Sequence, residues 1–350
     1  MKVPLRCFLA VGLATALVLT GCTSTSAPSS QSAAAATAGV APPQSTPPAS
    51  TTRSDRDANY LTVCSFNIQW LGQSAKRDNT ALADLLAPYD IVVIQELIAA
   101  PATNESDSGT RQRTADFFGE MGRRGFAFHL AASDTGPNGP LGTSTSRTEW
   151  WVTFFRPERI EPAAGLPQGF VSMPLAKNPD YDRVPYALPL RTTDRRFDFV
   201  LLSVHLNPDK ARTRRAHELK ALGSWITAES ARQAEKDFIV LGDTNIQGQA
   251  ELRAVIPAGM VSLNADCVGT NVSPKSPKPY DQVFFSPTYT TEIDRGFGFR
   301  VVNLIEEMRS RWTSSAPYPG DPYQPNVFRY YYSDHNPVVF RIKVPDRDDD

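Results

Sequence analysis

Near its C-terminus the chain reads Ser333-Asp334-His335-Asn336-Pro337, followed by Val338-Val339-Phe340-Arg341-Ile342. The apolar run behind the proline predicts a β-strand that enters a core. A carboxylate and an imidazole stand together just before this strand. Because a strand end is a rigid platform, the pair is a candidate for acid–base chemistry, although Ser-Asp-His also fits an ordinary turn. Matching motifs elsewhere in the chain decide whether this pair marks a functional site.

Two upstream apolar runs end in oxygen donors. The strand predicted over 61–67 ends at Asn67, after which 68–72 leads into a loop, and the run 90–94 ends in Gln95-Glu96. Amide and carboxylate oxygens are the hard ligands that Mg²⁺ or Mn²⁺ prefers. Taken singly, each residue is better explained as a polar cap on a strand end.

Other apolar runs also begin or end in polar side chains, namely Glu149, His205, Asp243, Asn245 and Asp281. Gly242 allows a sharp turn that would aim Asp243 and Asn245 into one cleft. The remaining histidines receive no role. His129 lies in a predicted strand, and His217 lies on a charged helix where we expect it to be solvated.

The residue pattern also predicts the neighbouring elements. Helices are expected over 79–86, with Asn79 as cap, 108–123 and 212–235, and strands over 126–131, 149–155, 197–205, 238–241 and 280–285. The stretch 133–147 is rich in Gly, Ser, Thr and Pro and predicts a mobile loop.

The first 58 residues differ from the rest. Lys2 and Arg6 precede an apolar run at 8–19, which is typical of a secretory signal at 1–21. Its end, Leu19-Thr20-Gly21-Cys22, resembles a bacterial lipobox, in which Cys22 is lipidated. An ordinary signal peptide with an incidental cysteine is the alternative. Residues 22–58 have hardly any large apolar side chains and predict a flexible tether. The folded domain is expected over 59–345, with a solvated acidic tail at 346–350.

Composition and charge narrow the function. The chain has 350 residues, 41% of them hydrophobic, as in soluble globular proteins. Without Lys2 and Arg6 of the leader, 34 of the 36 basic residues remain against 37 acidic ones, so no general attraction to polyanions is expected. An enzyme that holds a phosphodiester locally through a metal is still compatible with this charge. Cys64 and Cys267 could pair in a secreted chain. We favour two free, buried thiols, because Cys64 falls in a predicted buried strand.

The ordered set of motifs resembles the endonuclease/exonuclease/phosphatase superfamily, the fold of deoxyribonuclease I and exonuclease III. Independent loops would not produce such a set together, and it covers residues 60–343. The matching pieces, in order, are Ser65-Phe66-Asn67-Ile68-Gln69, Ile94-Gln95-Glu96, Glu149 with Phe155-Arg156-Pro157, Val204-His205, Gly242-Asp243-Thr244-Asn245, Tyr280-Asp281 and Ser333-Asp334-His335-Asn336-Pro337.

The resemblance implies a four-layered α/β sandwich, with two packed β-sheets flanked by helices, and a hydrolase of phosphate esters. The cofactor would be Mg²⁺ or Mn²⁺, with Ca²⁺ as a further candidate. Glu96 would be the principal metal ligand and Asp334 a further one, while Asn67 would hold metal or phosphate. Asn245 would orient water or phosphate. Arg183 matches an arginine that binds phosphate in the deoxyribonuclease I branch.

The same resemblance implies the proton chemistry. His205 and His335 would act on protons and on the charge that develops at phosphorus. Asp281 would pair with one imidazole and Glu149 with the other, which raises a histidine's pKa and fixes its ring. Asp243, like Asn245, would orient the attacking water or the phosphate, or contact a second metal.

We therefore expect an exported monomer, anchored to a membrane through lipid on Cys22, that hydrolyses a phosphodiester substrate, DNA or RNA. Two alternatives are an enzyme acting on lipid head-groups or sugar phosphates and a non-catalytic surface-binding protein. Gln282 stands where deoxyribonuclease I has an arginine, and Leu97-Ile98 follows Glu96 where that enzyme has a groove-binding arginine. Duplex binding in that enzyme's manner is therefore not expected.

Overall fold

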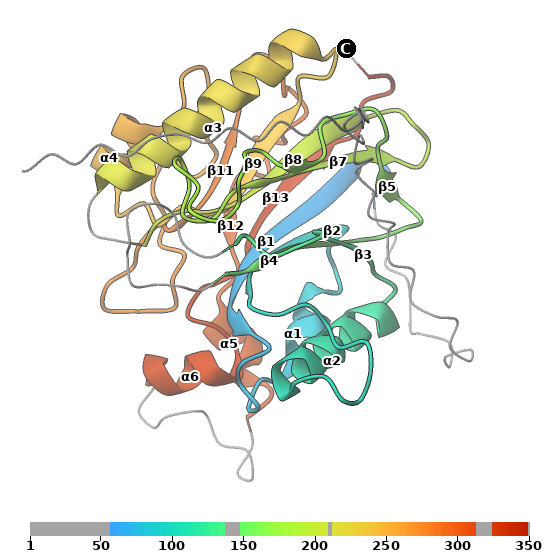
Figure 1. Ribbon diagram of the computed structural model, residues 1–350, viewed down its shortest axis with the longest axis vertical. Coiled ribbons are helices and arrows are strands. Elements are labelled where there is room, and N and C mark those ends of the chain that lie inside the picture. Colours follow the sequence, from blue (N-terminus) through green and yellow to red (C-terminus); the bar gives the residue numbers. More distant parts are fainter. Residues whose placement is uncertain (1–56, 137–147, 209–211, 313–323, 349–350) are drawn as a thin grey trace, which may run out of the picture. The chain divides into compact units, whose positions relative to one another are not determined.

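Two β-sheets form the centre of the computed structural model, which describes residues 57–136, 148–208, 212–312 and 324–348. Among these residues the first sheet has six strands, in the order β12-β13-β1-β2-β4-β3 (Figure 1). They are β1 (Tyr60–Leu71), β2 (Ile91–Leu97), β3 (Ala127–Leu130), β4 (Trp150–Phe155), β12 (Arg300–Val301) and β13 (Val338–Lys343). β1 and β2 are parallel, whereas β4 and β13 run antiparallel to them.

The second sheet has seven strands in the same described ranges. Their order is β10-β11-β9-β8-β7-β5, and β6 pairs with β7. They are β5 (Ile160–Pro162), β6 (Gly169–Phe170), β7 (Tyr186–Thr192), β8 (Asp198–His205), β9 (Phe238–Asp243), β10 (Val261–Ser262) and β11 (Asp281–Phe285). β8 and β9 are parallel, and β11 is antiparallel to β9.

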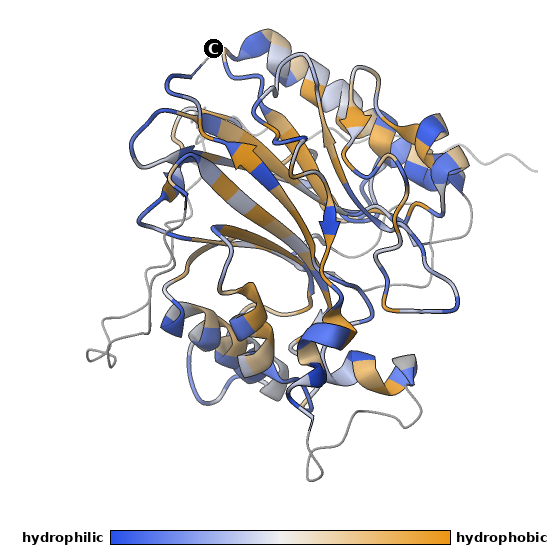
Figure 2. Ribbon diagram, turned by 180° about the vertical axis from the view of Figure 1, so that it is seen from behind, coloured by the Kyte–Doolittle hydropathy of each residue, from blue (hydrophilic) through white to orange (hydrophobic). Residues whose placement is uncertain are grey.

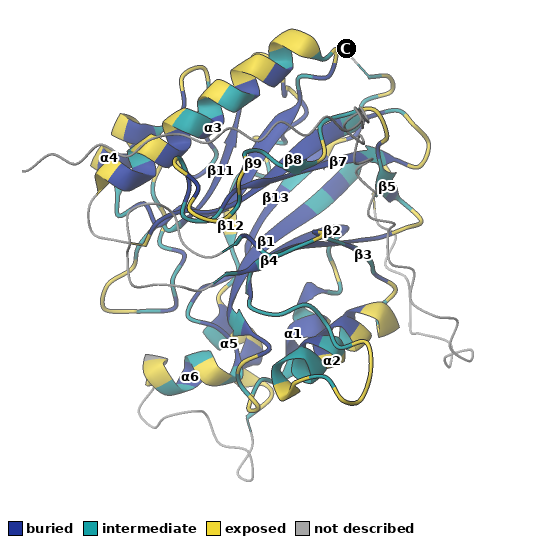
Figure 3. Ribbon diagram, viewed as in Figure 1, coloured by how far each residue is buried: buried dark blue, intermediate teal, exposed yellow. Residues whose placement is uncertain are grey.

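Apolar side chains from the two sheets share one core. Val63 and Ile91 of the first sheet pack in the same cluster as Leu201 and Ile239 of the second, and all four are fully buried. Figures 2 and 3 show these strands as hydrophobic and buried along most of their length. Full burial of one such side chain contributes about 1.5–3 kcal/mol. The central strands read as nearly continuous apolar runs because both faces are covered.

Helices cover the outer face of each sheet (Figure 1). The first sheet is covered by α1 (Asn79–Leu86), α2 (Gly109–Arg123), α5 (Leu304–Arg309) and α6 (Pro325–Tyr331). The second is covered by α3 (Arg212–Arg232) and α4 (Gln249–Val255), and α3 presents Leu219, Leu222 and Ile226 to it at helical spacing. This arrangement confirms the predicted four-layered α/β sandwich. In the described ranges, no helix is both long enough and apolar enough to cross a bilayer.

Strand direction brings the candidate residues to one edge of both sheets. Asn67 and Glu96 lie toward the carboxyl ends of parallel β1 and β2, and antiparallel β4 and β13 begin at that edge. Parallel β8 and β9 end at His205 and Asp243, which are register partners. Antiparallel β11 begins with Asp281 opposite Asp243. Residues far apart in the sequence therefore become neighbours.

β1 is longer than predicted, so the prediction that the strand ends at Asn67 was wrong. The strand continues to Leu71, and its register against β2 shifts between Asn67 and Leu71. Ile68 and Leu71 are fully buried, which keeps this stretch on the sheet. Trp70 has a φ of 50°, a left-handed conformation that is strained for a tryptophan.

Three local predictions also need correction. The cap of α1 is Asp78 rather than Asn79, because an Asp78 oxygen accepts the Ala81 N–H at 2.9 Å. Cys64 and Cys267 are both free, but only Cys64 is buried and Cys267 is half-buried. The acidic tail is not wholly solvated, since Asp348 accepts a hydrogen bond from the Asp198 N–H at 3.2 Å.

Some predictions fall outside the described residues. They concern the signal sequence at 1–21, Cys22, the tether up to residue 56 and most of the loop expected at 133–147.

Gly242 permits close approach of β8 and β9. Its φ is +137°, and a Cβ there would lie 2.1 Å from the Val204 carbonyl oxygen. Gly242→Ala is expected to lower the free energy of unfolding by at least about 2 kcal/mol, because the backbone cannot move away without breaking the sheet. Gly122→Ala in α2 is the matched control, since a Cβ there meets nothing within 4 Å. Urea unfolding of Gly122→Ala should show an unchanged or slightly higher free energy of unfolding. Equal decreases in both variants would contradict the predicted clash at Gly242.

Candidate active site

His335 lies between two carboxylates. Its Nδ1 is 2.8 Å from Asp281 Oδ2, and its Nε2 is 3.5 Å from Asp243 Oδ2. Burial alone would lower the pKa of His335, but the carboxylates of Asp281 and Asp243 outweigh burial and hold the pKa well above its usual value. Because Asp281 engages Nδ1, Nε2 is the nitrogen available to exchange a proton with a bound group.

His205 is held in the same way from the other side. Its Nδ1 is 3.1 Å from Glu149 Oε2, and its Nε2 is 3.5 Å from Asp243 Oδ2. Burial and the charge of Arg183 lower the pKa of His205, but Glu149 and Asp243 raise it above its usual value. Burial would raise the pKa of Glu149, and the charge of His205 outweighs this and lowers it. The two histidines thus face one shared aspartate, each with a carboxylate of its own.

Asn67 links this pair to Glu96. Its Nδ2 donates to Glu96 Oε1 at 3.1 Å and to Asp243 Oδ2 at 3.0 Å. Glu96 Oε2 accepts the Trp70 N–H at 3.0 Å, and the Glu96 N–H donates to Glu149 Oε2 at 2.9 Å. Burial raises the pKa of Glu96, against the charge of His205. A cation bound to the carboxylate would stabilise its ionised form and lower this pKa.

The donors around Glu96 fit an oxygen-liganded divalent cation. Within the described residues, the buried oxygens Asn67 Oδ1 and Asp334 Oδ1 have no hydrogen-bond partner. In the same ranges no three His, Cys, Asp or Glu side chains are arranged to hold a metal. Mg²⁺ does not need such a cage, because it keeps several waters and takes one or two carboxylates together with substrate phosphate. Glu96 and Asn67 could supply this partial set, with Asp334 as the third predicted ligand.

A small cavity of about 30 Å³ opens beside these groups, which is room for about one water or one ion. It is lined by Trp70, Glu96, Ile98, Thr148, Glu149 and Arg183. Arg183 Nε lies 3.9 Å from Glu149 Oε1, and its Nη1 donates to the His205 carbonyl oxygen at 3.4 Å. The structure therefore places the predicted phosphate-binding arginine at the cavity wall.

Asn245 is partly committed to the fold. Its φ is 54°, its N–H donates to Asp243 Oδ1 at 2.9 Å, and its Nδ2 donates to the Leu206 carbonyl oxygen at 3.0 Å. One of its two side-chain amide hydrogens is used in this way. Asn245 thus fixes Asp243 and the end of β8, while its predicted role toward water or phosphate stays a prediction.

Ser333 ties the motif 333–337 to β1, a role that the sequence did not indicate. Its hydroxyl donates to the Asn67 carbonyl oxygen at 2.6 Å and accepts the N–H groups of Gln69 and His335 at 3.2 and 3.1 Å. A hydroxyl can donate and accept at once. Gln69 in turn donates to Asp334 Oδ2 at 2.9 Å. This explains a serine before Asp334 and His335.

Glu218, buried on α3, clamps two loops of the site. Its Oε1 accepts the Asp182 N–H at 3.0 Å, and its Oε2 accepts the Asn207 N–H at 2.9 Å. Asp182 precedes Arg183, and Asn207 follows His205 by two residues. Sequence reasoning missed Glu218 because it lies among charged residues of a helix that reads as solvated. Burial raises its pKa to about 7, although the two N–H donors oppose this.

This raised pKa predicts a pH-dependent stability. Unfolded glutamate titrates near 4.5, so the native state binds this proton more tightly between pH 4.5 and about 7. The contribution of Glu218 to the free energy of unfolding therefore falls as pH rises through that window, by about 3 kcal/mol. Glu218→Gln does not titrate. In urea unfolding, the free energy of unfolding of the wild type should fall relative to that of Glu218→Gln as pH rises from 4.5 to about 7. A difference that stays constant with pH would contradict the raised pKa of Glu218.

The two histidines without a predicted role make their hydrogen bonds elsewhere. His129 is buried, with Nε2 2.9 Å from the Tyr186 hydroxyl. His217 has a half-exposed side chain, with Nε2 3.0 Å from Asp180 Oδ1.

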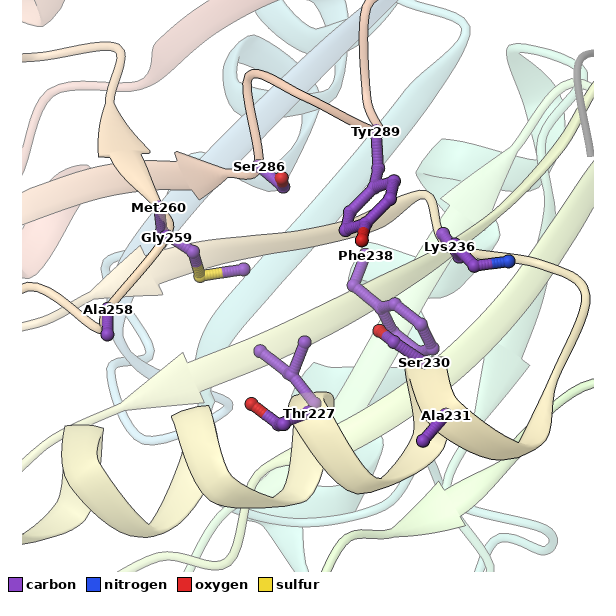
Figure 4. Close-up of a pocket in the computed structure, with 11 residues that line it drawn as sticks. Thr227, Ser230, Ala231, Lys236, Phe238, Ala258, Gly259, Met260, Ser286 and Tyr289 are labelled. Carbon is purple, nitrogen blue, oxygen red and sulfur yellow. The ribbon is translucent and has the colours of Figure 1, made fainter.

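A larger cavity lies away from the catalytic candidates. It has a volume of about 300 Å³ and includes Thr227 of α3, Phe238, Met260 and Tyr289 in its lining (Figure 4). None of the predicted site residues lines it. Cavity size alone therefore does not single out the predicted site residues.

No protein-family model matches this chain, and no curated protein matches it. Solved structures do. An endonuclease/exonuclease/phosphatase family protein from Bacteroides thetaiotaomicron is 16% identical with a TM-score of 0.53, and the match covers 82% of this chain and 98% of that one. Truncated TDP2 from Caenorhabditis elegans is 12% identical with a TM-score of 0.52, covering 81% and 98%. Humanized D. rerio TDP2 with 14 mutations is 16% identical with a TM-score of 0.50, covering 81% and 99%. The chain therefore has the fold of the endonuclease/exonuclease/phosphatase proteins.

Proposed function

We propose that this protein is a divalent-metal-dependent phosphodiesterase and that it acts as a nuclease on DNA or RNA. One observation carries the proposal. His205 and His335 each have their own carboxylate, Glu149 or Asp281, and both Nε2 atoms lie 3.5 Å from Asp243. A site with two oriented imidazoles beside oxygen donors suits phosphoryl chemistry. The fold supports the same class of enzyme.

The geometry suggests how the side chains would divide the work. Hydrolysis needs charge stabilisation on the phosphate, a base for water and an acid for the leaving oxygen. A divalent cation held by Glu96 and Asn67 would supply Lewis-acid stabilisation of a phosphate oxygen. His335 would hold a proton at Nε2, with Asp281 fixing its ring. Asp243, facing both rings, would accept a hydrogen bond from the attacking water and align it.

The nucleic-acid substrate is supported by the spelling of the first motif, Phe66-Asn67-Ile68-Gln69, which is nearest to that of deoxyribonuclease I. The near-neutral charge of the chain fits an enzyme that grips a phosphodiester locally rather than through a broad basic surface. Arg183 at the cavity wall would contribute to that grip.

The envelope location is part of the proposal. Lipid on Cys22 would anchor the exported monomer, and the tether 22–58 would hold the domain away from the membrane. Cys22→Ser is expected to move the protein from the membrane fraction to the soluble fraction of cells. Retention of the variant on membranes would contradict the anchor.

A substrate panel tests the activity. Plasmid, linear duplex, single-stranded DNA, RNA, sphingomyelin and a generic phosphodiester are each supplied with Mg²⁺, Mn²⁺ or Ca²⁺, with and without chelator. We expect turnover of DNA or RNA that chelator abolishes. Turnover of lipid alone would favour a head-group phosphodiesterase, full activity in chelator would overturn the metal requirement, and no turnover of any ester would favour a binding protein.

A further inference from the structure

Trp70 lies at the wall of the small cavity beside Glu96 and Arg183 (the catalytic cavity). Trp70 lines the cavity together with Glu96 and Arg183, and its N–H donates to Glu96 Oε2 at 3.0 Å. Trp70 keeps its strained φ of 50° three residues after Asn67. Such strain persists where the surrounding structure imposes a conformation, and it is frequent at functional sites. Trp70 thus lies at the edge of the candidate active site, next to the predicted metal ligand Glu96.

Arg329 and Tyr330 of α6 lie beside Trp70. The Arg329 guanidinium carbon is 5.8 Å from the centre of the Trp70 ring and 5.3 Å from that of Tyr330. A closely stacked pair in this chain, Arg300 on Phe297, is at 3.7 Å, so Arg329 is not tightly stacked on either ring. Tyr330 is 41% exposed.

Arg329 also has unused hydrogen-bonding capacity. In the described part of the chain it forms no ion pair, and its buried Nε has no acceptor. Leaving a buried donor of a cation without a partner is unfavourable, and an anion that reached the guanidinium would offset this cost. The Arg329 carbonyl oxygen is fixed by Arg77 Nη1 at 3.2 Å, so this part of α6 is tied to the loop that follows β1.

We propose that Trp70, Arg329 and Tyr330 form a nucleotide subsite next to the catalytic cavity. Trp70 and Tyr330 stack on an unpaired base, and Arg329 binds the phosphate that neighbours the scissile one. The inference rests on the proposed nuclease function and names its substrate as single-stranded nucleic acid. Aromatic rings combined with arginine are typical of proteins that bind single strands, because every base has a stacking face.

The charge of this subsite opposes another ligand that aromatic residues often bind. Quaternary ammonium head-groups fit aromatic cages that lack a competing cation. Here the Arg329 guanidinium lies within 6 Å of both ring centres and would repel such a group. The subsite therefore favours a neutral base joined to an anionic phosphate over a choline lipid.

The test compares two strands that differ only in their bases. The full chain carrying His335→Ala, which is expected not to cleave, is mixed with Mg²⁺ and either a short labelled oligothymidylate or an abasic phosphodiester strand of the same length. Anisotropy gives the two Kd values. We expect the base-bearing strand to bind at least about tenfold more tightly. Trp70→Ala or Tyr330→Ala should abolish that preference. Arg329→Gln should weaken the binding of both strands by the same factor.

Tyr289→Ala is the matched control, because Tyr289 is 47% exposed and lies at the larger cavity near α3. It should retain the preference. Thermal unfolding shows whether Trp70→Ala is folded, and Tyr330→Ala truncates an exposed ring, so it tests the subsite even if Trp70→Ala unfolds. Equal Kd values for the two strands in the His335→Ala protein would overturn the subsite. So would a preference for the base-bearing strand that survives both Trp70→Ala and Tyr330→Ala. Binding of sphingomyelin vesicles that depends on Trp70, without strand preference, would also overturn it.

Failure of the subsite and failure of the nuclease function give different results. If the wild-type protein cleaves both strands equally well, and Trp70→Ala leaves both rates unchanged, only the subsite is wrong. If the wild-type protein cleaves no strand with any divalent ion, the nuclease function is wrong whatever the Kd values show.

Discussion

Replacing His335 with alanine is expected to lower kcat for phosphodiester hydrolysis by about 10²–10⁴-fold. Its Nε2 is the available nitrogen of a ring held 2.8 Å from Asp281, so the variant loses both the proton carrier and the charge beside Asp243. Initial rates at saturating substrate with Mg²⁺ measure the effect. His217→Ala is the control, because that half-exposed ring pairs with Asp180, and its rate should be unchanged.

Asp281 should act through His335. Asp281→Asn removes the charge that raises the histidine's pKa and loosens the ring, so a smaller loss than in His335→Ala is expected. The double variant should be no slower than His335→Ala alone, because two residues that act as a unit are not additive. Losses that multiply in the double variant would show that Asp281 serves another purpose.

Glu96→Gln is expected to lower kcat/KM by at least roughly 100-fold and to raise the Mg²⁺ concentration needed for activity. Although the substitution lowers activity, it should not lower the free energy of unfolding of the metal-free protein. Burial raises the pKa of Glu96, so its ionised form destabilises the metal-free fold. Urea unfolding in chelator should therefore show the variant as stable as the wild type or more so.

Glu306→Gln is the matched control for Glu96→Gln, since the Glu306 side chain is 57% exposed. It should leave the rate and the Mg²⁺ requirement unchanged. If Glu96→Gln weakened the fold in chelator and left the Mg²⁺ requirement unchanged, the carboxylate would be structural rather than a metal ligand.

Strand ends could be read from the sequence because apolar runs are local patterns. The runs before Glu96 and His205 and the run after His335 mark strands whose directions then bring these residues together. Their convergence also required the order of motifs, because periodicity carries no information on which strand neighbours which. The fold was therefore predicted by resemblance, and the structure supplied the distances.

The supporting residues could not be predicted in this way. Glu218 joins residues on two loops through its carboxylate, and Ser333 bonds to Asn67 from 266 positions away. Such contacts leave no local pattern in the sequence. The sequence predicts a strand end before Trp70, because the shift in β1 register cannot be read from residue types. Arg329 cannot be predicted from the sequence, because a single arginine on a short helix has no signature.

A crystal structure with Mn²⁺ and inorganic phosphate tests the central claim most directly, because anomalous scattering locates the ion without reference to activity. We predict one Mn²⁺ peak at the Glu96 carboxylate and Asn67 Oδ1, with phosphate oxygens within hydrogen-bonding distance of His335 and His205. A Mn²⁺ peak elsewhere, or a phosphate that reaches neither histidine, would contradict a single catalytic centre at this edge of the sheets.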